Sequence, residues 1–591
     1  MPKDAAMPTG VRAEGRAGLT PELAPELKVE IGQFSAAGRK AENQDFHGAL
    51  VPEGRELALK GIVLAVADGI SSSAVSAEAA EIAVKALLTD YYATPDAWTV
   101  RTAATRVIAA SNAWLHGQNA SVGDINRGRV CTLSALVLKG RQAHVLHLGD
   151  SRVARLSGQS LEPLTEDHRV VLSREESYLG RALGLGPQVE VEYRCLPLSV
   201  GDIFVLSTDG VHEHVTGREV AEAIAATPTL EAAARRLADV ALAAGSPDNL
   251  TVQILRVDAL PEEGAEALTG PRLPVPPLPR PGEVIDGLRI ERALHSSARS
   301  HVFVATQGDG SRVALKIPAS ETAADEAYLR RFMLEEWIAR RLSSAHVLRA
   351  APTPEGRRAL YVVTELVEGC TLRQWMTDNP NPPLARVRDI LDQVAAGLRA
   401  FHRREMIHQD LRPENVMIDG AGTVKIIDLG SAFVAGAEEA APGVLPLMPG
   451  TYQYTAPEYF SGDEVSWRSD QFALGVIAYE MLTGGRLPYG NRVARIASRR
   501  DQARLSYDSA RSEENALPGW VDAALRRATH PDPRRRYDAL SEFMADLRSP
   551  GATWRAEAHV PLVERHPLRF WQGLSALLAL LCLVLALQLA G

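Results

Sequence analysis

The 591-residue chain has little cysteine, few aromatic residues and no excess of positive charge. Its cysteines (Cys131, Cys195, Cys370 and Cys582) lie far apart and form no C-x-x-C pair, which argues against a disulfide scaffold or a thiolate zinc site and fits a reducing compartment. Aromatic residues make up 5%, so the cores must rely on Leu, Val, Ile and Ala. With 64 Lys and Arg against 73 Asp and Glu, the chain has no global basic field, and we expect no nucleic-acid partner.

Proline is concentrated between residues 259 and 282, which read ALPEEGAEALTGPRLPVPPLPRPG. This density prevents regular hydrogen bonding and favours extended polyproline, so it predicts an interdomain spacer, with a docking site for a proline-binding module as the alternative. We therefore expect a disordered lead at 1–26, a first domain at 27–258, the linker at 259–282 and a second domain at 283–549.

The end of the chain differs from the rest because residues 570–590 contain no charge. The run is just long enough to cross a bilayer as a helix, and Phe570 and Trp571 stand at its start with Arg565 and Arg569 before them. It predicts a single C-terminal transmembrane helix at 570–590 after a juxtamembrane segment at 550–569, with the catalytic domains on the cytoplasmic side. The alternative is a buried core helix or an amphipathic hairpin.

Apolar runs in the first half are repeatedly bordered by aspartate. Residues 61–67 precede Asp68, residues 202–208 precede Asp209, and residues 250–255 follow Asp248. One Asp-Gly pair alone would be a turn, but several carboxylates gathered at strand ends repel one another unless a cation neutralises them. Hard oxygen ligands of this kind suit Mg or Mn rather than zinc.

These residues belong to a series of motifs that resembles the metal-dependent PPM (type 2C) protein Ser/Thr phosphatases. In chain order the motifs are Gly38–Asp45, Val66–Gly69, Cys131–Leu133, Leu148–Arg152, Leu164–His168, Arg181–Gly184, Ser207–Gly210 and Ser246–Thr251. The resemblance implies a β-sandwich flanked by helices (αββα) with a two-metal Mg or Mn centre. Its ligands would be Asp45, Asp68 and the Gly69 carbonyl for one ion, with Asp68 bridging, and Asp209 and Asp248 for the other.

The phosphate-binding basic residue departs from the pattern of this family. Lys40 occupies the position where the family usually has arginine, and Arg39 precedes it. Arginine binds phosphate through a bidentate fork and lysine binds it as a point charge, so we favour Arg39 slightly.

The second half contains a lysine within an apolar strand and a separate set of polar loop residues. Lys316 lies in the run 312–317 and needs an anionic partner if buried, which Glu335 or Glu336 of the predicted helix 332–342 could supply. Residues 407–418 and 424–430 bring a carboxylate, an amide and a second carboxylate beside short strands, as a base and a metal clamp on a triphosphate require.

These segments resemble the eukaryotic-type protein kinases over residues 284–548, which implies a bilobal fold that uses ATP with Mg. By this resemblance Lys316 would grip the nucleotide phosphates and pair with Glu335, and Asp410 would orient the substrate hydroxyl. Asn415 and Asp428 would hold Mg, Glu365 to Val367 would form the adenine hinge, and Arg412 stands where the family has a catalytic lysine. Two further departures are a glycine-free loop at 294–302 and Gln409 in place of arginine before Asp410.

The sequence thus predicts a membrane-tethered bifunctional enzyme with opposing activities. The first domain would dephosphorylate phospho-Ser/Thr proteins, and the second would phosphorylate Ser/Thr proteins, with the chain itself as one hypothetical substrate. The alternative is an active phosphatase regulated by a nucleotide-binding pseudokinase scaffold, which the altered glycine loop and Arg412 motivate.

Overall fold

The computed structural model describes residues 26–171, 177–261, 273–354, 356–440, 452–512, 517–551, 554 and 570–579. The chain divides into two compact units. Unit 1 comprises Met1–Ala93 and Ala104–Glu263, and unit 2 comprises Thr94–Ala103 and Gly264–Gly591.

Unit 1 is built on two five-stranded antiparallel sheets. The first sheet has the order β1 (Lys28–Ala36), β12 (Leu250–Ala259), β11 (Ile203–Ser207), β6 (Arg152–Ser157) and β7 (Ser160–Pro163). The second has the order β10 (Glu192–Pro197), β5 (Gln142–Leu148), β4 (Leu133–Lys139), β3 (Ile62–Asp68) and β2 (Asp45–Leu50). The apolar residues of β3 and β4 are buried on both faces, as expected for strands covered by a second sheet and by helices.

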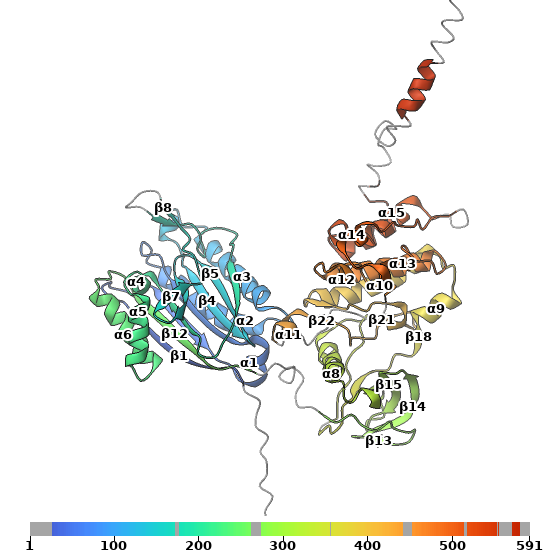
Figure 1. Ribbon diagram of the computed structural model, residues 1–591, viewed down its shortest axis with the longest axis horizontal. Coiled ribbons are helices and arrows are strands. Elements are labelled where there is room, and N and C mark those ends of the chain that lie inside the picture. The colour runs from blue at the N-terminus through green and yellow to red at the C-terminus, as the bar shows by residue number, and fades with distance from the viewer. Residues whose placement is uncertain are drawn as a thin grey trace, which may run out of the picture. The chain divides into compact units, whose positions relative to one another are not determined.

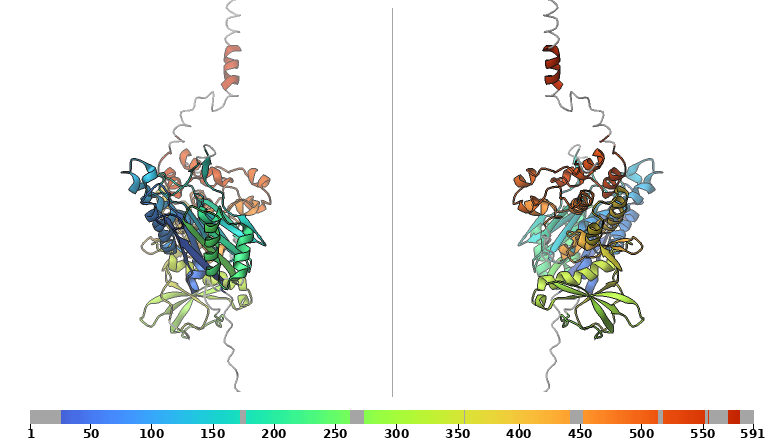
Figure 2. Two further views of the ribbon diagram at one scale, coloured as in Figure 1. Left: turned by 90° about the vertical axis from the view of Figure 1, so that its left-hand side faces the viewer. Right: turned by 90° about the vertical axis from the view of Figure 1, so that its right-hand side faces the viewer.

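Helices cover the outer face of each sheet in unit 1. Helix α2 (Ser76–Ala93) packs on β2 and β3, while α6 (Leu230–Ala243) packs on β1 and β12. In the left view of Figure 2, α5 (Gly217–Ala226) and α6, drawn in green, lie on the side of unit 1 that faces the viewer, and α3 (Val100–Asn119) follows α2 in the chain. The result is the expected αββα sandwich. The shorter elements are α1 (Gly54–Lys60), η1 (Ile125–Arg127), β8 (Arg169–Val171), β9 (Ser177–Leu179) and α4 (Asp209–His212).

Unit 2 begins with a five-stranded antiparallel sheet. Its strands are β13 (Val284–Ile285), β14 (Leu288–Ser296), β15 (Ser300–Thr306), β16 (Arg312–Pro318) and β17 (Val362–Glu365). Leu315, Phe303 and Val363 belong to its buried core, and helix α8 (Glu326–Arg341) packs against β17. The short η2 (Ser320–Thr322) precedes α8.

A helical lobe follows the sheet, as the orange helices of Figure 1 show. Helix α13 (Trp467–Leu482) lies at its centre, buried from Ser469 to Leu482, and contacts α10 (Leu384–His402) and α15 (Gly519–Ala528). The remaining helices are α9 (Leu372–Asp378), η3 (Pro413–Asn415), α11 (Ala435–Ala440), α12 (Glu458–Ser461), η4 (Val493–Arg495), α14 (Arg499–Ala503), η5 (Pro533–Arg535) and α16 (Leu540–Arg548). Its short strands are β18 (Gly369–Thr371), β19 (Met406–Ile407), β20 (Val416–Asp419), β21 (Val424–Ile426) and β22 (Phe433–Val434). The bilobal architecture predicted for this half is therefore present.

The proline-rich segment is more ordered at its end than a simple spacer would be. Leu273 and Val275 pack against an apolar cluster that includes Leu329 and Phe332 of α8. The Leu360 amide donates to the Pro274 carbonyl at 2.8 Å. Residues 273–282 thus form part of unit 2, while residues 262–272 lie outside the described ranges.

Unit 2 also contains a segment that the sequence assigned to the first domain. The Thr99 amide donates to Glu405 Oε2 at 3.0 Å, and Arg341 Nη2 lies 2.8 Å from Asp96 Oδ2. These contacts place residues 94–103 in unit 2, although they fall inside the predicted domain 27–258.

The predicted transmembrane helix is described only in part. Residues 570–579 are helical, and Trp571, Leu577 and Leu578 are at least half exposed, whereas residues 580–590 lie outside the described part of the chain. Among the described residues, no helix has both the length and the apolar character needed to cross a bilayer. The expectation of a spanning helix is therefore unsupported by the described structure.

Candidate functional sites

The predicted metal ligands of unit 1 come from the ends of its central strands. Asp45 opens β2 and Asp68 closes β3, and the two are paired directly across the antiparallel ladder. Directly opposed residues project to the same face, about 5 Å apart at Cβ. Asp209 follows β11 and Asp248 precedes β12, which are neighbouring strands of the other sheet. The charges of these aspartates influence one another, so the four carboxylates form one electrostatic cluster.

The electrostatics of this cluster favour a bound cation. Burial, followed by Asp209 and Asp248, raises the pKa of Asp45 to about 6, while hydrogen bonds from Thr251 and Thr208 oppose the rise. Burial and the neighbouring aspartates raise the pKa of Asp68 well above its usual range. Burial, then Asp150 and Asp248, also raise the pKa of Asp209. Asp45, Asp68 and Asp209 are therefore destabilised as anions by burial and by neighbouring carboxylates, which a bound cation would reverse.

Two of these carboxylates have oxygens available for such an ion. Asp45 Oδ1 and Asp209 Oδ1 are buried and have no hydrogen-bond partner among the described residues. A buried charged oxygen without a partner is costly, so these two oxygens fit the role of metal ligands. The donor set consists of oxygens only, which fits Mg or Mn and not a soft metal.

The backbone at Gly69 approaches helix α2 too closely to carry a side chain. A Cβ at Gly69 would lie 2.7 Å from the backbone carbon of Ser76, and the Gly69 amide donates to the Gln44 carbonyl at 3.1 Å. The residue after Asp68 is thereby held against the loop that leads into Asp45.

The adjacent basic residues Arg39 and Lys40 point to different partners. Lys40 forms an ion pair with Asp248 and donates to Ser71 Oγ at 2.7 Å. Arg39 instead donates to the carbonyls of Leu242 and Gly245, at 3.3 and 3.5 Å. The structure therefore brings Lys40 to the carboxylate cluster, not Arg39, which the sequence interpretation had favoured slightly.

Three other residues organise this site and were given no role in the sequence interpretation. Thr208 Oγ1 donates to Asp45 Oδ2 at 2.8 Å. The buried Asn249 side chain accepts from the Gln44 amide and donates to the carbonyls of Ala37 and Glu42, which fixes the loop before Asp45. Arg169 contacts Asp150 and Asp209. Thr208 and Asn249 lie inside two of the phosphatase-like motifs, so the sequence could have indicated their roles. Arg169 lies just outside such a motif, directly after His168.

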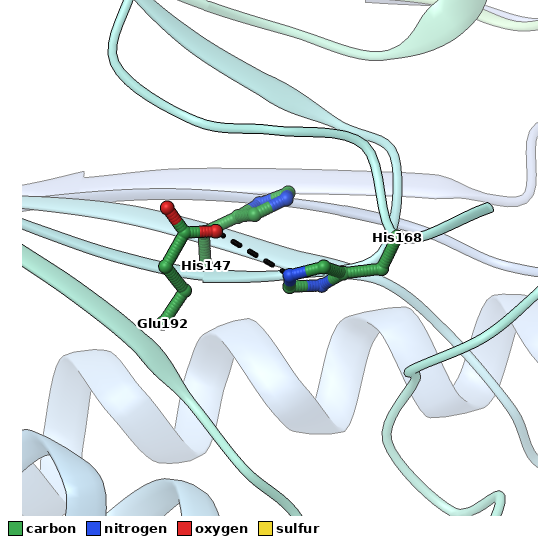
Figure 3. A group of neighbouring side chains, drawn as sticks. All are labelled: His147, His168 and Glu192. Carbon is green, nitrogen blue, oxygen red and sulfur yellow. Dashed lines mark ion pairs between the residues drawn. The ribbon is translucent and has the colours of Figure 1, made fainter.

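A second group of potential ligands, His147, His168 and Glu192, has ligand atoms within 4.8 Å of one another (Figure 3). His147 Nε2 lies 2.9 Å from the Glu166 carbonyl, to which it must donate, and Nδ1 lies 2.9 Å from Ser134 Oγ. His168 Nδ1 accepts from the Gly149 amide at 3.2 Å, and Nε2 lies 3.3 Å from Glu192 Oε2. All four ring nitrogens already have partners, and burial lowers the pKa of His147 to about 4. We interpret this group as a hydrogen-bonded structural network and assign it no metal.

The predicted phosphate-binding lysine of unit 2 lies between two carboxylates. Lys316 Nζ is 2.7 and 3.0 Å from the Glu335 oxygens and 3.3 Å from Asp428 Oδ1. Burial opposes the charge of Lys316, but Asp428 and Glu335 raise its pKa overall, and Lys316 in turn lowers the pKa of Asp428. Glu336, the alternative partner, pairs with Arg340 and Arg357 instead.

A second set of polar residues surrounds Asp410 on the loop after β19. Asn415 Nδ2 donates to Asp410 Oδ2 at 3.0 Å and to its carbonyl at 2.8 Å. Arg412 Nε lies 3.5 Å from the same Asp410 Oδ2. Burial raises the pKa of Asp410, and the positive charge of Arg412 opposes that rise.

The backbone of this loop is held by a buried aspartate. Asp470 accepts from the amides of His408 and Gln409, at 2.9 and 3.0 Å, and Gln409 has a positive φ of 67°. This conformation is costly for a side chain other than glycine, so Asp470 stabilises the loop that carries Asp410.

The predicted hinge residues line an open depression of about 610 Å³. Glu365 and Val367 contribute to it, together with Arg312, Asp419 and Lys425, and Glu365 Oε2 pairs with Lys425 at 2.7 Å. Lys316 and Asp428 are not among its lining residues, so this depression is distinct from the phosphate-binding group.

The two units thus present a carboxylate cluster in an αββα sandwich and a Lys–Glu–Asp group in a bilobal fold. Residues 33–248 match the family model described as protein phosphatase 2C, and residues 290–545 match the protein kinase domain. The chain therefore matches the protein phosphatase 2C model in its first half and the protein kinase domain model in its second half.

Curated relatives match the kinase region. The chain is 35% identical over 239 residues to the serine/threonine-protein kinase PknL of Mycobacterium tuberculosis, covering 40% of this chain and 58% of PknL. It is 29% identical over 271 residues to the serine/threonine-protein kinase PrkC of Bacillus subtilis, covering 45% of this chain and 41% of PrkC. The chain thus spans about half the length of these relatives.

Solved structures are also similar to part of the chain. One is the catalytic domain of the serine/threonine protein phosphatase PstP in complex with 2 manganese ions, at 26% identity and a TM-score of 0.34, covering 39% of this chain and 99% of that chain. Another is PppA of Pseudomonas aeruginosa, at 25% identity and a TM-score of 0.34, covering 39% of this chain and 97% of that chain.

Proposed function

We propose that unit 1 hydrolyses phospho-Ser/Thr residues of proteins with a pair of Mg or Mn ions. The observation that carries this proposal is the pair of buried oxygens, Asp45 Oδ1 and Asp209 Oδ1, which have no hydrogen-bond partner among the described residues. Asp45, Asp68, Asp209, Asp248 and the Gly69 carbonyl would hold the ions. When bound, two such metal ions supply an activated water molecule and neutralise the charge of the phosphate. Lys40, paired with Asp248, would attract and orient the phosphate of the substrate.

We propose that unit 2 transfers phosphate from ATP to Ser or Thr residues of proteins. This proposal rests on the arrangement in which Lys316 Nζ contacts both Glu335 and Asp428. Asp428 and Asn415 would hold Mg, and Glu365 to Val367 would contact adenine. Asp410 would accept the proton of the substrate hydroxyl, and Arg412 would add positive charge beside the transferring group.

The pseudokinase alternative has one structural argument in its favour. The turn between β14 and β15 contains no glycine and is closed by Ser297, whose hydroxyl donates to the Ser300 carbonyl at 3.0 Å. Such a turn has less backbone freedom to follow a triphosphate. The assembled Lys316–Glu335–Asp428 group argues for transfer activity.

One set of assays tests both activities in the full chain. Wild type should transfer labelled phosphate from ATP to a generic protein acceptor, and Asp410→Asn should abolish the transfer. Hydrolysis of a phosphoserine peptide should require Mn or Mg and should be lost in Asp209→Asn. If ATP binds without transfer in wild type, unit 2 is a pseudokinase; if neither metal supports hydrolysis, the proposed function of unit 1 is wrong.

We further propose that residues 570–590 anchor the chain in a membrane with both catalytic units on the cytoplasmic side. Support comes from the absence of charge in this segment and from the exposed apolar side chains of the helix at 570–579. Exposure of several large apolar side chains on one helix is unfavourable in water. The full chain should float with anionic lipid vesicles in a density gradient, and a chain ending at residue 569 should not. Recovery of both in the soluble fraction would contradict the anchor.

A further inference from the structure

The guanidinium of Arg169 contacts three carboxylates of unit 1. Arg169 Nε lies 2.6 Å from Asp150 Oδ2, Nη2 lies 2.9 Å from Asp209 Oδ2, and Nη1 lies 3.2 Å from Glu213 Oε1. Asp209 is also one of the proposed metal ligands. A single arginine therefore links the proposed metal centre to a carboxylate, Asp150, that has no place in the predicted ligand set.

Arg169 occupies a position between two carboxylates that a divalent cation could otherwise neutralise. The Asp150 side chain is only 9% exposed, and the Asp209 side chain is 20% exposed. Two carboxylates this close repel each other, and the planar fork of arginine neutralises both at once.

The two oxygens of Asp209 have different surroundings. Oδ2 accepts a hydrogen bond from Arg169, while Oδ1 is buried without a hydrogen-bond partner among the described residues. Arg169 thus engages half of a proposed ligand. Any ion that required both oxygens of Asp209, or Asp150 together with Asp209, would first have to displace the guanidinium.

A second arginine of unit 1, Arg152, forms an ion pair that does not involve any proposed metal ligand. Arg152 binds Asp167 through Nε at 2.8 Å and through Nη2 at 2.7 Å. This pair is also a partly buried arginine–carboxylate contact, with both hydrogen bonds to one carboxylate, and it includes none of the proposed ligands. It is the matched control for the loss of an arginine–carboxylate contact in the same unit.

We propose that Arg169 is a tethered cation that competes with divalent ions for the Asp150–Asp209 carboxylate pair and so weakens metal binding in unit 1. The inference rests on the proposed metal centre. Removing the guanidinium leaves the two carboxylates without their cation and makes their oxygens available to a metal ion. Because hydrogen bonds to charged groups are strong, we expect about a tenfold gain in affinity for the competing ion.

The test is a titration of the full chain with Mn²⁺ alone, without ATP, by calorimetry and by the electron paramagnetic resonance signal of free Mn²⁺. All proteins carry Asp428→Asn, so that binding at the nucleotide site of unit 2 is suppressed. Arg169→Gln should bind Mn²⁺ about tenfold more tightly than its parent, and Arg152→Gln should bind with the affinity of the parent. Equal or weaker binding by Arg169→Gln would overturn the inference.

A second variant covers the case in which Arg169→Gln fails to fold. Arg169→Lys keeps the charge but replaces the planar five-donor fork with a single ammonium group, so it should fold and show a smaller gain in affinity. No gain in this variant would also overturn the role of Arg169. If neither parent nor variants bind Mn²⁺, the metal centre itself is absent and the proposed function of unit 1 fails first; binding that is equal in all of them rejects Arg169 alone.

Discussion

At the residue scale, two adjacent basic side chains in unit 1 have separate tasks. Lys40 is paired with Asp248 and lies within the carboxylate cluster, whereas Arg39 is hydrogen-bonded to the carbonyls of Leu242 and Gly245. The Leu242 carbonyl belongs to the last turn of α6, where a cation is favourable. Arg39 therefore lies at a helix terminus, and Lys40 is the residue that we propose meets an anionic substrate.

Exchange of each residue for glutamine tests this division of roles. Lys40→Gln should lower kcat/KM for a phosphoserine peptide by about tenfold or more, because a charged contact to the phosphate is lost. Arg39→Gln should change kcat/KM by less than about twofold while lowering the melting temperature slightly. Steady-state kinetics at saturating Mn²⁺ measure both. A larger loss of kcat/KM in Arg39→Gln than in Lys40→Gln would reverse the assignment.

The aspartates of the cluster could be predicted from sequence, but the arginine beside them could not. Asp68 and Asp209 directly follow apolar strands, so their place at the ends of the sheets follows from the alternation of runs and turns. Arg169 reaches Asp209 across 40 residues of chain, and nothing local in the sequence specifies that contact. The choice between Arg39 and Lys40 was equally out of reach, since adjacent residues point in directions that only the folded loop determines.

At the scale of elements, the end of the proline-rich segment packs against helix α8. Leu273 and Val275 pack against Leu329 and Phe332 of this helix, which also carries Glu335. The Leu360 amide closes the contact by donating to the Pro274 carbonyl. Composition alone predicted a spacer at 259–282, because proline excludes regular structure but does not exclude packing. The segment at 273–275 is better described as part of the kinase fold.

This packing predicts that shortening its side chains will weaken nucleotide binding. The double variant Leu273→Ala, Val275→Ala should destabilise unit 2 by about 1–2 kcal/mol, because partly buried methyl groups are lost beside α8. If α8 then holds Glu335 less firmly against Lys316, the Kd for Mg-ATP should rise by about threefold. Denaturant unfolding and calorimetry measure the two effects.

Leu278 provides the matched control for this experiment. Its side chain lies in the same segment but is 54% exposed, so Leu278→Ala should leave both quantities unchanged. An unchanged melting curve and Kd in the double variant would show that the segment is a passive linker.

At the scale of the whole molecule, the sequence predicted two catalytic domains in series, and family matches over 33–248 and 290–545 are consistent with that order. The sequence did not predict all the segments that make up unit 2. Residues 94–103 follow α2 in the chain, yet the amide of Thr99 bonds Glu405, which lies 306 residues away. Local periodicity identifies helices and strands but carries no information about such distant partners. The same limit applies to long-range ion pairs such as Arg341–Asp96.

The proposal that one chain carries two opposing activities leads to a prediction about the chain as its own substrate. A tethered phosphatase meets phosphate on its own chain at an effective concentration on the order of millimolar, independent of dilution. With labelled ATP, Asp209→Asn should therefore accumulate about threefold or more label than wild type, and Asp410→Asn should accumulate none. The difference should persist when all proteins are diluted, because hydrolysis within one chain does not depend on protein concentration. Equal labelling of wild type and Asp209→Asn would exclude self-reversal, and a difference that disappears on dilution would assign it to encounters between separate chains.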